Sequence, residues 1–346
     1  MYNLHFYQAM LVPGLLALGL TAGCQSQPSE TTSQAADTVL TEPATVSLIL
    51  DTDIGPDYDD VGAMALLHAL ADQGEADILA VVSSNLSPLV VPTIDVLNTY
   101  FGRPDIPIGA PKTAGVDLPA RQHWSDTLVA EYPHDLKSTS EAPDAVQVYR
   151  QVLSAQPDSS VTIVTVGFLT NMRNLMESPP DELSPLSGRE LVAQKVKQWV
   201  AMAGKFPEGV EFNVEKDAAA SQVAIDEWPT PVLFSGFEIG EKVLTGLRLI
   251  KGGNPESPVQ KVYAISIPMD ENDKNGRMSW DQTAVLVAVR GAEPYYEVER
   301  GKFITRPDGS NAWQDDPNGP HRKLVEKMPP EEVAAQIETL MMHEPQ

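Results

Sequence analysis

The fold is decided by residues 46–71, VSLILDTDIGPDYDDVGAMALLHALA. An apolar run over 46–50 predicts a buried strand, and the alanine- and leucine-rich pattern over 61–71 predicts a helix. Between them, the ten residues from Asp51 to Asp60 carry five carboxylates and no basic residue. A loop between a strand end and a helix is where open α/β sheets bind ligands, so this loop is the candidate functional centre.

The five carboxylates predict a bound cation. Charges this close repel one another and raise each other's pKa unless a cation compensates them. Asp59 and Asp60 fall in the first turn of the expected helix, where the helix dipole stabilises negative charge. Oxygen donors without Cys or His suit Ca²⁺ or Mg²⁺. We expect a Ca²⁺ site rather than a solvated acidic loop, because the loop lies between two apolar elements.

Composition narrows the class of partner. The chain has 346 residues, of which 42% are hydrophobic, enough for a sizeable core. Its net charge of −24 argues against binding nucleic acid or an anionic membrane through a basic face. A neutral polar small molecule is the expected substrate, and a homo-oligomer is left open.

The N-terminal segment predicts export. Residues 9–24 form an apolar run that ends in Ala22-Gly23-Cys24, which resembles a bacterial lipoprotein processing site. Residues 1–23 are then a signal peptide, and Cys24, the sole cysteine, is the lipidated residue. The protein is expected to be exported and lipid-anchored to the cell envelope, at the outer membrane or in the periplasm. A plain secretory signal or a short membrane anchor is the alternative.

Residues 24–45 are polar and rich in Ser, Thr and Gln, and we expect a flexible tether there. Residues 46–346 alternate short apolar runs with helical periodicity, which predicts one α/β domain. Its sheet is expected to be open, mostly parallel and Rossmann-like, with helices on its faces. Strands are expected at 46–51, 77–83, 161–166, 196–202 and 231–235. Helices are expected at 59–72, 90–101, 142–155, 169–177, 215–227, 258–267 and 281–290.

The acidic loop resembles that of the inosine-uridine preferring nucleoside hydrolases, in which D-T-D-x-G…D-D follows an apolar strand. Further segments similar to that family follow in order along residues 46–290: Val164–Asn171, Met202–Gly204, Glu211–Asn213, Asp217–Ala220, Trp228-Pro229 and Trp280-Asp281. The resemblance implies the nucleoside hydrolase fold. It also implies Ca²⁺-dependent cleavage of the N-glycosidic bond of a ribonucleoside, giving ribose and free base.

Residue roles also follow from the resemblance. It implies that Ca²⁺ is bound by the side chains of Asp53, Asp60 and Asp281 and by the carbonyl oxygen of Val166. The remaining ligand positions go to the ribose 2′- and 3′-hydroxyls and one water, for which Asp53 is the general base. The implied contacts to the sugar come from Asp59, Asn85, Met202, Glu211 and Asn213, with Glu211 near the 5′-hydroxyl.

The residue types fit this chemistry independently. Cleavage of an N-glycosidic bond develops oxocarbenium character on the ribose, which surrounding carboxylates stabilise. A metal-bound water is oriented and acidified, so a nearby carboxylate can accept its proton. Clamping a sugar diol on the ion fixes the substrate's orientation.

Two features depart from the shortest family pattern. The loop is two residues longer and carries the additional Asp57, which either supports the ligands from outside or exchanges roles with Asp59. Trp280 occupies the position where pyrimidine-accepting members have a histidine that protonates the leaving base. Purine-preferring members resemble this chain there, which implies that a purine stacks on Trp280, with Trp124 or Tyr58 as a second stacking face. Such stacking makes a purine nitrogen easier to protonate, so Trp280 would be a catalytic residue that replaces the histidine acid.

Residues 111–140 have weak periodicity and contain His123 and His134, which predicts either a closing lid or a surface loop. His68 lies inside an expected helix and is interpreted as structural. Three other functions stay open. A dehalogenase-type phosphatase would use Asp51 as nucleophile, although Ile54-Gly55 does not fit that class. The others are hydrolysis of a different N-riboside, and a lipid-anchored protein that binds nucleoside or ribose without turnover.

Overall fold

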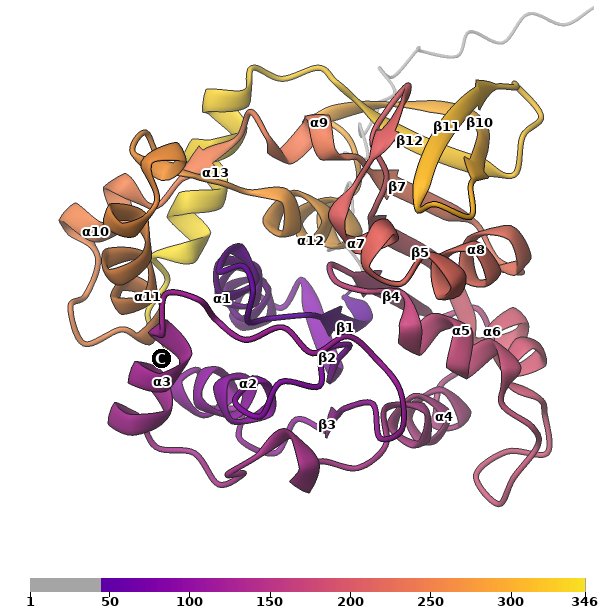
Figure 1. The fold of residues 1–346 in the computed structure, drawn as a ribbon, viewed down its shortest axis with the longest axis horizontal. Coiled ribbons are helices and arrows are strands. Elements are labelled where there is room, and N and C mark those ends of the chain that lie inside the picture. The colour runs from indigo at the N-terminus through magenta and orange to yellow at the C-terminus, as the bar shows by residue number, and fades with distance from the viewer. Residues whose placement is uncertain (1–44, 346) are drawn as a thin grey trace, which may run out of the picture. The chain divides into compact units, whose positions relative to one another are not determined.

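The computed structural model describes residues 45–345, and its centre is a mostly parallel sheet (Figure 1). Within those residues ten strands join in the order β3-β2-β1-β4-β5-β7-β12-β10-β11-β6. They are β1 (Val46–Thr52), β2 (Ala76–Ser83), β3 (Ile108–Gly109), β4 (Val161–Thr165), β5 (Val196–Met202), β6 (Glu208–Val210), β7 (Val232–Ser235), β10 (Tyr296–Thr305), β11 (Ser310–Asp315) and β12 (His321–Glu326). A separate antiparallel pair joins β8 (Leu244–Thr245) to β9 (Arg277–Met278).

Helices cover the sheet and connect its strands. They are α1 (Asp59–Asp72), α2 (Val90–Tyr100), α3 (Trp124–Glu131), α4 (Ala145–Ala155), α5 (Thr170–Glu177), α6 (Gly188–Lys195), α7 (Phe212–Lys216), α8 (Ala218–Glu227), α9 (Phe237–Gly240), α10 (Leu247–Gly252), α11 (Pro258–Ser266), α12 (Trp280–Arg290) and α13 (Pro330–Met341). Helix α1 packs against α12, α13 and β2, and every residue from Asp59 to Leu70 is buried. This enclosure explains why the α1 sequence is apolar on all sides.

The parallel part of the sheet creates the crevice. Strand β1 pairs in parallel with β2 on one side and with β4 on the other. The chain runs outward through β2 and β3, then returns to β4 and continues through β5 and β7. Loops leave β1 and β4 in opposite directions at this switch point, and such a divergence opens a ligand crevice at the carboxyl ends of the strands. The residues that follow β1 are Asp53 to Tyr58.

The far side of the sheet is antiparallel. Strand β12 is parallel to β7, but β10 is antiparallel to β12, β11 to β10 and β6 to β11. Figure 1 shows β10, β11 and β12 together at one end of the molecule. The short β6 immediately precedes Glu211, so this C-terminal extension reaches the candidate site. No strand was predicted beyond 235.

The predicted α/β class with a mostly parallel sheet is confirmed, and α1 and β5 have the predicted bounds. The helix predicted at 215–227 is wrong in one respect, because it is divided at Asp217 into α7 and α8. The stretch 111–140 is not wholly irregular, since it contains α3. The predicted signal peptide, the tether and Cys24 lie outside the described residues. Within 45–345, no helix is long and apolar enough to span a membrane.

Candidate metal and substrate site

A cavity of about 180 Å³ lies at the carboxyl ends of β1 and β4. Apart from Asn85, every predicted metal or substrate residue lines it: Asp53, Asp59, Asp60, Val166, Met202, Glu211, Asn213, Trp280 and Asp281. These residues come from segments more than 200 positions apart. The cavity is also lined by Asp57, Phe212, Phe237 and Arg277, of which the sequence drew attention only to Asp57.

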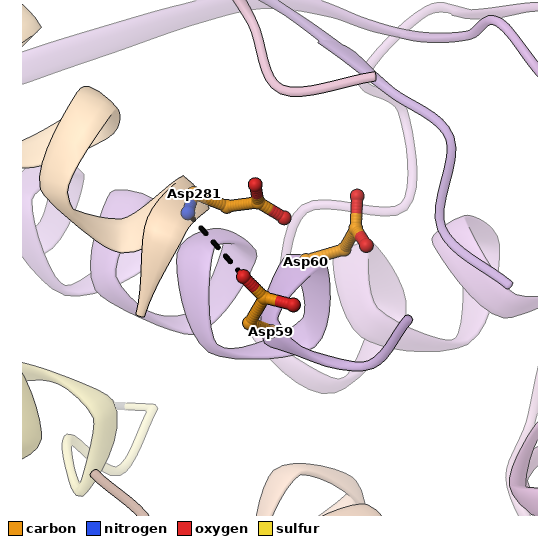
Figure 2. A group of neighbouring side chains, drawn as sticks. All are labelled: Asp59, Asp60 and Asp281. Carbon is orange, nitrogen blue, oxygen red and sulfur yellow. Dashed lines mark hydrogen bonds between the residues drawn. The ribbon is translucent and has the colours of Figure 1, made fainter. Parts of the chain in front are cut away.

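Three carboxylates form the tightest group in the cavity. Each of Asp59, Asp60 and Asp281 offers one oxygen, and these oxygens lie within 4.8 Å of one another. Figure 2 shows Asp59 and Asp60 on the first turn of α1 and Asp281 on the first turn of α12, with the carboxylates of Asp60 and Asp281 facing each other. Two helix N-termini therefore stabilise the same concentration of negative charge.

One fully buried carboxylate oxygen of this group has no hydrogen-bond partner among the described residues. The Thr52 hydroxyl donates to Oδ1 of Asp60, whereas Oδ2 of Asp60 is buried without a hydrogen bond. Burial raises the pKa of Asp60, Asp281 and Asp53 well above the ordinary carboxyl value, and repulsion among the aspartates raises it further. A buried carboxylate oxygen that lacks a donor is costly unless it binds a cation. The donor set is all oxygen, which fits a hard divalent ion.

The cavity wall opposite α1 comes from the β4–α5 turn. The carbonyl oxygen of Val166 lines the cavity and accepts a hydrogen bond from Asn213 at 3.1 Å. The next residue, Gly167, lies against the backbone of Asp53, and a Cβ there would be 2.4 Å from the Asp53 nitrogen. Any larger residue at 167 would push the turn away from Asp53, so this glycine keeps two predicted ligand positions close together.

Asp51 points away from this cavity. Its Oδ2 accepts hydrogen bonds from Tyr149 at 2.8 Å and from Asn171 at 3.0 Å, and the residue is fully buried. Burial raises the pKa of Asp51 to about 7. Asp51 thus stabilises the acidic loop from the side away from the cavity. A phosphatase mechanism with Asp51 as nucleophile is excluded by this geometry, because no phosphate ester can reach its oxygens.

Arg277 is a site residue that sequence analysis missed. Its Nε and Nη2 donate to Oδ1 of Asp59 at 3.3 and 2.8 Å, and Nη2 also donates to Asp57. The second oxygen of Asp59 accepts a weak hydrogen bond of 3.4 Å from the Asp281 backbone nitrogen. Asp57, the additional carboxylate of the long loop, is thus the partner of an arginine rather than a replacement for Asp59. The sequence offered one signal for Arg277, because it lies three residues before Trp280, which was already assigned to the site.

Another part of the cavity wall has polar groups suited to a sugar. Glu211 caps α7, with its carboxylate accepting from the backbone nitrogens of Asn213 at 2.8 Å, Val214 at 3.1 Å and Gly204 at 3.2 Å. The amide of Asn213 donates to the carbonyls of Val166 and Met202. These contacts hold Glu211, Asn213 and Met202 against one another, so a ligand meets a preformed set of polar groups.

Glu211 predicts a pH dependence of stability. Burial raises its pKa to about 7, although the backbone N–H groups oppose the shift. The pKa of Glu211 is higher in the folded state than in the unfolded state. The contribution of Glu211 to the free energy of unfolding is therefore fully present below about pH 4.5 and is lost as pH rises to about 7. Between pH 4.5 and 7.5, the wild type should lose about 3 kcal/mol of unfolding free energy relative to Glu211→Gln. Urea unfolding measures this, and a pH-independent difference between the two proteins contradicts the assignment.

Aromatic side chains form the third part of the cavity. The rings of Phe237 and Trp280 have centroids 5.2 Å apart at an interplanar angle of 35°, and Trp280 Nε1 donates to the Phe237 carbonyl at 2.7 Å. Phe212, which directly follows Glu211, also lines the cavity and is 37% exposed. The direct contact between Phe237 and Trp280 leaves no space for a base between their rings. A base can stack only against an outer face.

Three predicted positions lie elsewhere. Asn85 is buried outside the cavity, and its amide group bonds the backbone carbonyls of Asp53 and Leu118 and the nitrogens of Ser87 and Leu118. It therefore holds the metal loop in place, and the geometry does not favour a ribose contact. The second stacking face was wrong for both candidates: Trp124 is fully buried in the core, and Tyr58 is buried with its hydroxyl donating to Asp273.

The histidines also lie outside the cavity. His68 is buried, its ring stacks on Phe101 at 4.7 Å, and burial lowers its pKa to about 3, in keeping with a structural role. His123 is exposed and lies 3.4 Å from Asp126. His134 contacts the carbonyl of Tyr132. Neither of the last two lines the cavity, so the structure gives no support to a histidine lid.

The C-terminal extension fixes the loop that leads from Lys205 to Glu211 through Asn311. This fully buried residue of β11 accepts from the Lys205 nitrogen and donates to the Lys205 carbonyl, both at 2.9 Å. Strand β6 then pairs with β11 through Gly209 and its neighbours. The segment that leads to Glu211 is thus held at two points by a part of the chain over 100 residues away.

Asn311→Leu is expected to raise KM for a nucleoside about 10-fold, because the Lys205 backbone groups lose their partners and the loop loosens. Affinity for the divalent ion should stay within about 2-fold, since no predicted ligand lies on this loop. Steady-state kinetics and calcium calorimetry measure the two quantities. Asn318→Leu, an exposed asparagine from the turn before β12, is the control. Equal losses of ion and substrate binding contradict this role.

The fold and site together define a class. The fold is an open, mostly parallel α/β sheet, and buried carboxylates, polar groups and aromatic rings surround one cavity at its switch point. This arrangement suits a small polar ligand and a cation. A model of the family described as inosine-uridine preferring nucleoside hydrolase matches residues 48–336. The protein belongs to that family.

Individual relatives are more distant. An inosine-uridine preferring nucleoside hydrolase from Leishmania major is 25% identical over 190 residues, which are 52% of this chain and 57% of that protein. The chain thus spans little more than half of that curated relative. A purine-preferring ribonucleoside hydrolase from Gardnerella vaginalis has a TM-score of 0.66 at 16% identity, over 86% of this chain and 98% of that one. A plant nucleoside hydrolase has a TM-score of 0.64 at 21% identity, over 87% and 99%. These two structures share the fold.

Proposed function

We propose that the protein hydrolyses the N-glycosidic bond of a ribonucleoside with the help of a bound Ca²⁺ ion, giving ribose and free base. The observation that carries this proposal is the single cavity that joins three parts. Its wall combines buried carboxylates, one of them with an unpartnered buried oxygen, a capped glutamate with an asparagine, and aromatic rings. Family membership supports the same reaction.

The ligand set fits a calcium ion. Asp53, Asp60 and Asp281 with the Val166 carbonyl would supply the oxygens, and Asp59 is engaged by Arg277. When bound, the ion supplies an oriented, acidified water and a clamp for the sugar diol. The ion also offsets the mutual repulsion that raises the pKa of these aspartates.

The chain's own residues carry out the remaining tasks. Asp53 accepts the proton of the attacking water, because it is the carboxylate at the strand end that no other side chain neutralises. Glu211 and Asn213 bind the sugar hydroxyls, and the surrounding negative charge stabilises the oxocarbenium-like ribose. A nucleoside monophosphate should be a poor substrate, since the Glu211 carboxylate repels a 5′-phosphate.

A purine base is the proposed preference. Trp280 and Phe237 provide a large apolar surface in the cavity wall, and a purine covers more of it than a pyrimidine. The test is release of reducing sugar from inosine and uridine, each with added Ca²⁺ and with excess chelator. Release from inosine that exceeds release from uridine and stops with the chelator is expected. Binding of ribose and Ca²⁺ without release of base would instead identify a binding protein.

We also propose that the protein is exported and anchored by lipid on Cys24, on the sequence pattern of residues 9–24 alone. Labelled fatty acid should appear on the wild type and not on Cys24→Ser when each is expressed in a bacterial host. Equal labelling of both proteins would contradict this attachment site.

A further inference from the structure

Arg277 lines the cavity but has no role in the reaction proposed above. Among residues 45–345, it is the one cationic side chain that lines the cavity. Its side chain is 8% exposed, so it is largely removed from water. A buried arginine in a protein of net charge −24 is expected to have a specific partner or ligand.

Carboxylates hold the guanidinium in one orientation. Nε donates to Asp59, and Nη2 donates to both Asp59 and Asp57, as described above. The third nitrogen, Nη1, is 3.8 Å from Asp273 and makes no hydrogen bond within the described part of the chain. The arginine is therefore rigid at two nitrogens and has an unused donor at the third. Arginine stays protonated, so this donor always carries positive charge.

The guanidinium lies beside two aromatic rings, one of which lines the cavity. Its Cζ is 5.2 Å from the centre of the Trp280 ring and 4.9 Å from that of Tyr58. If the proposed function holds, the sugar diol lies at Asp60 and Asp281, and the 5′ side lies near Glu211. The base then lies against Trp280 and Phe237, and Arg277 adjoins Trp280.

We propose that Arg277 contacts the departing base and stabilises the negative charge that develops on it. As the bond between C1′ and the base nitrogen breaks, both electrons go to that nitrogen. The water oxygen bonds C1′, and its proton goes to Asp53. The guanidinium donates a hydrogen bond to an acceptor atom of the base and keeps its proton, and solvent water later protonates the released base. Arg277 is then a catalytic residue, and Asp57 and Asp59 are its positioning residues.

This role fits the departure of Trp280 from the histidine pattern. An indole cannot protonate a leaving base, and here its N–H is already bonded to the Phe237 carbonyl. Charge stabilisation by an oriented donor can replace proton transfer when the site is shielded from water. The additional Asp57 of the long loop also gains a function, because it fixes the guanidinium in its orientation.

The test compares two leaving groups. The base of inosine is a poor leaving group unless the enzyme stabilises its negative charge. In contrast, p-nitrophenyl β-ribofuranoside releases a phenolate that is a good leaving group by itself. Arg277→Gln should lower kcat for inosine at least ~100-fold, as for the loss of one oriented donor, and change kcat for the nitrophenyl riboside less than ~5-fold. Arg277→Lys keeps the charge and should recover part of the inosine rate. Calcium affinity, measured by calorimetry, should change less than ~3-fold in both variants, because the carboxylates bonded to Arg277, Asp57 and Asp59, are not among the proposed ligands.

Two results would overturn the inference. One is an equal loss for both substrates, which would make Arg277 a structural support of the acidic loop. The other is a loss of calcium affinity that accounts for the fall in rate. Should Arg277→Gln fail to fold, the ratio of the two rates in Arg277→Lys decides, since an unchanged ratio contradicts contact with the base. Failure of the proposed function has a different result, because the wild type would then cleave neither substrate.

Discussion

Asp53→Ala is expected to abolish both turnover and high-affinity calcium binding. The residue is 3% exposed, lines the cavity and lies at the end of the central strand beside the Val166–Gly167 turn. Removing the proposed general base alone lowers the rate by about 10²–10⁴-fold. Loss of a proposed metal ligand adds to this, so base release from inosine should fall at least about 10³-fold.

Asp77→Ala is the matched control, since Asp77 is an exposed carboxylate on the neighbouring strand β2. It removes the same charge from the protein and should leave the rate and the calcium affinity unchanged. A near-normal rate in Asp53→Ala would show that Asp53 is neither the base nor a ligand. Loss of turnover with calcium affinity intact would keep Asp53 as the base and remove it from the ligand set.

Removal of divalent ions is expected to stop turnover and to lower thermal stability. The carboxylates of Asp53, Asp60 and Asp281 are buried close together, and without a cation their repulsion opposes folding. An ion that binds only the folded state stabilises it by about 2.7 kcal/mol at a concentration 100 times Kd. For a chain of this size, that corresponds to a rise in Tm of roughly 5 °C.

Calorimetric melting with EDTA and with increasing Ca²⁺ measures this effect. Asp281→Asn keeps the size of the side chain and should remove most of the calcium-dependent rise in Tm. Its own Tm in EDTA should be equal to or above that of the wild type, because one repelling charge is gone. A wild-type Tm that is the same in EDTA and in excess Ca²⁺ contradicts a built cation site.

The central part of the fold could be predicted from local pattern. The apolar run before Asp51 and the enclosed helix after Asp60 are unambiguous, because strands and helices buried on all sides have continuous apolar sequences. The loop after β1 was identified as the candidate site because open α/β sheets bind ligands at strand ends, whereas the site residues after β4 and β5 came from family resemblance. The second acidic helix start, at Asp281, came from family resemblance and not from periodicity.

The rest depended on contacts that sequence pattern does not encode. Strands β10 to β12 are amphipathic and partly exposed, and their attachment to β7 is decided by long-range pairing. The role of Asn311 depends on that pairing. Arg277 follows an Asp/Asn/Gly-rich stretch, and its carboxylate partners are Asp273 nearby and the distant Asp57 and Asp59 near the start of α1. The family resemblance implied that Asn85 contacts the sugar, but backbone groups of neighbouring loops use its whole amide.

The most direct test of the central claim is a crystal structure of the protein with Ca²⁺ and ribose, with the ion identified from its anomalous scattering. The account predicts one ion bonded to carboxylate oxygens of Asp53, Asp60 and Asp281 and to the Val166 carbonyl, with two ribose hydroxyls completing its coordination. An ion bound elsewhere, or a ribose held in the cavity without contact to the ion, would contradict it.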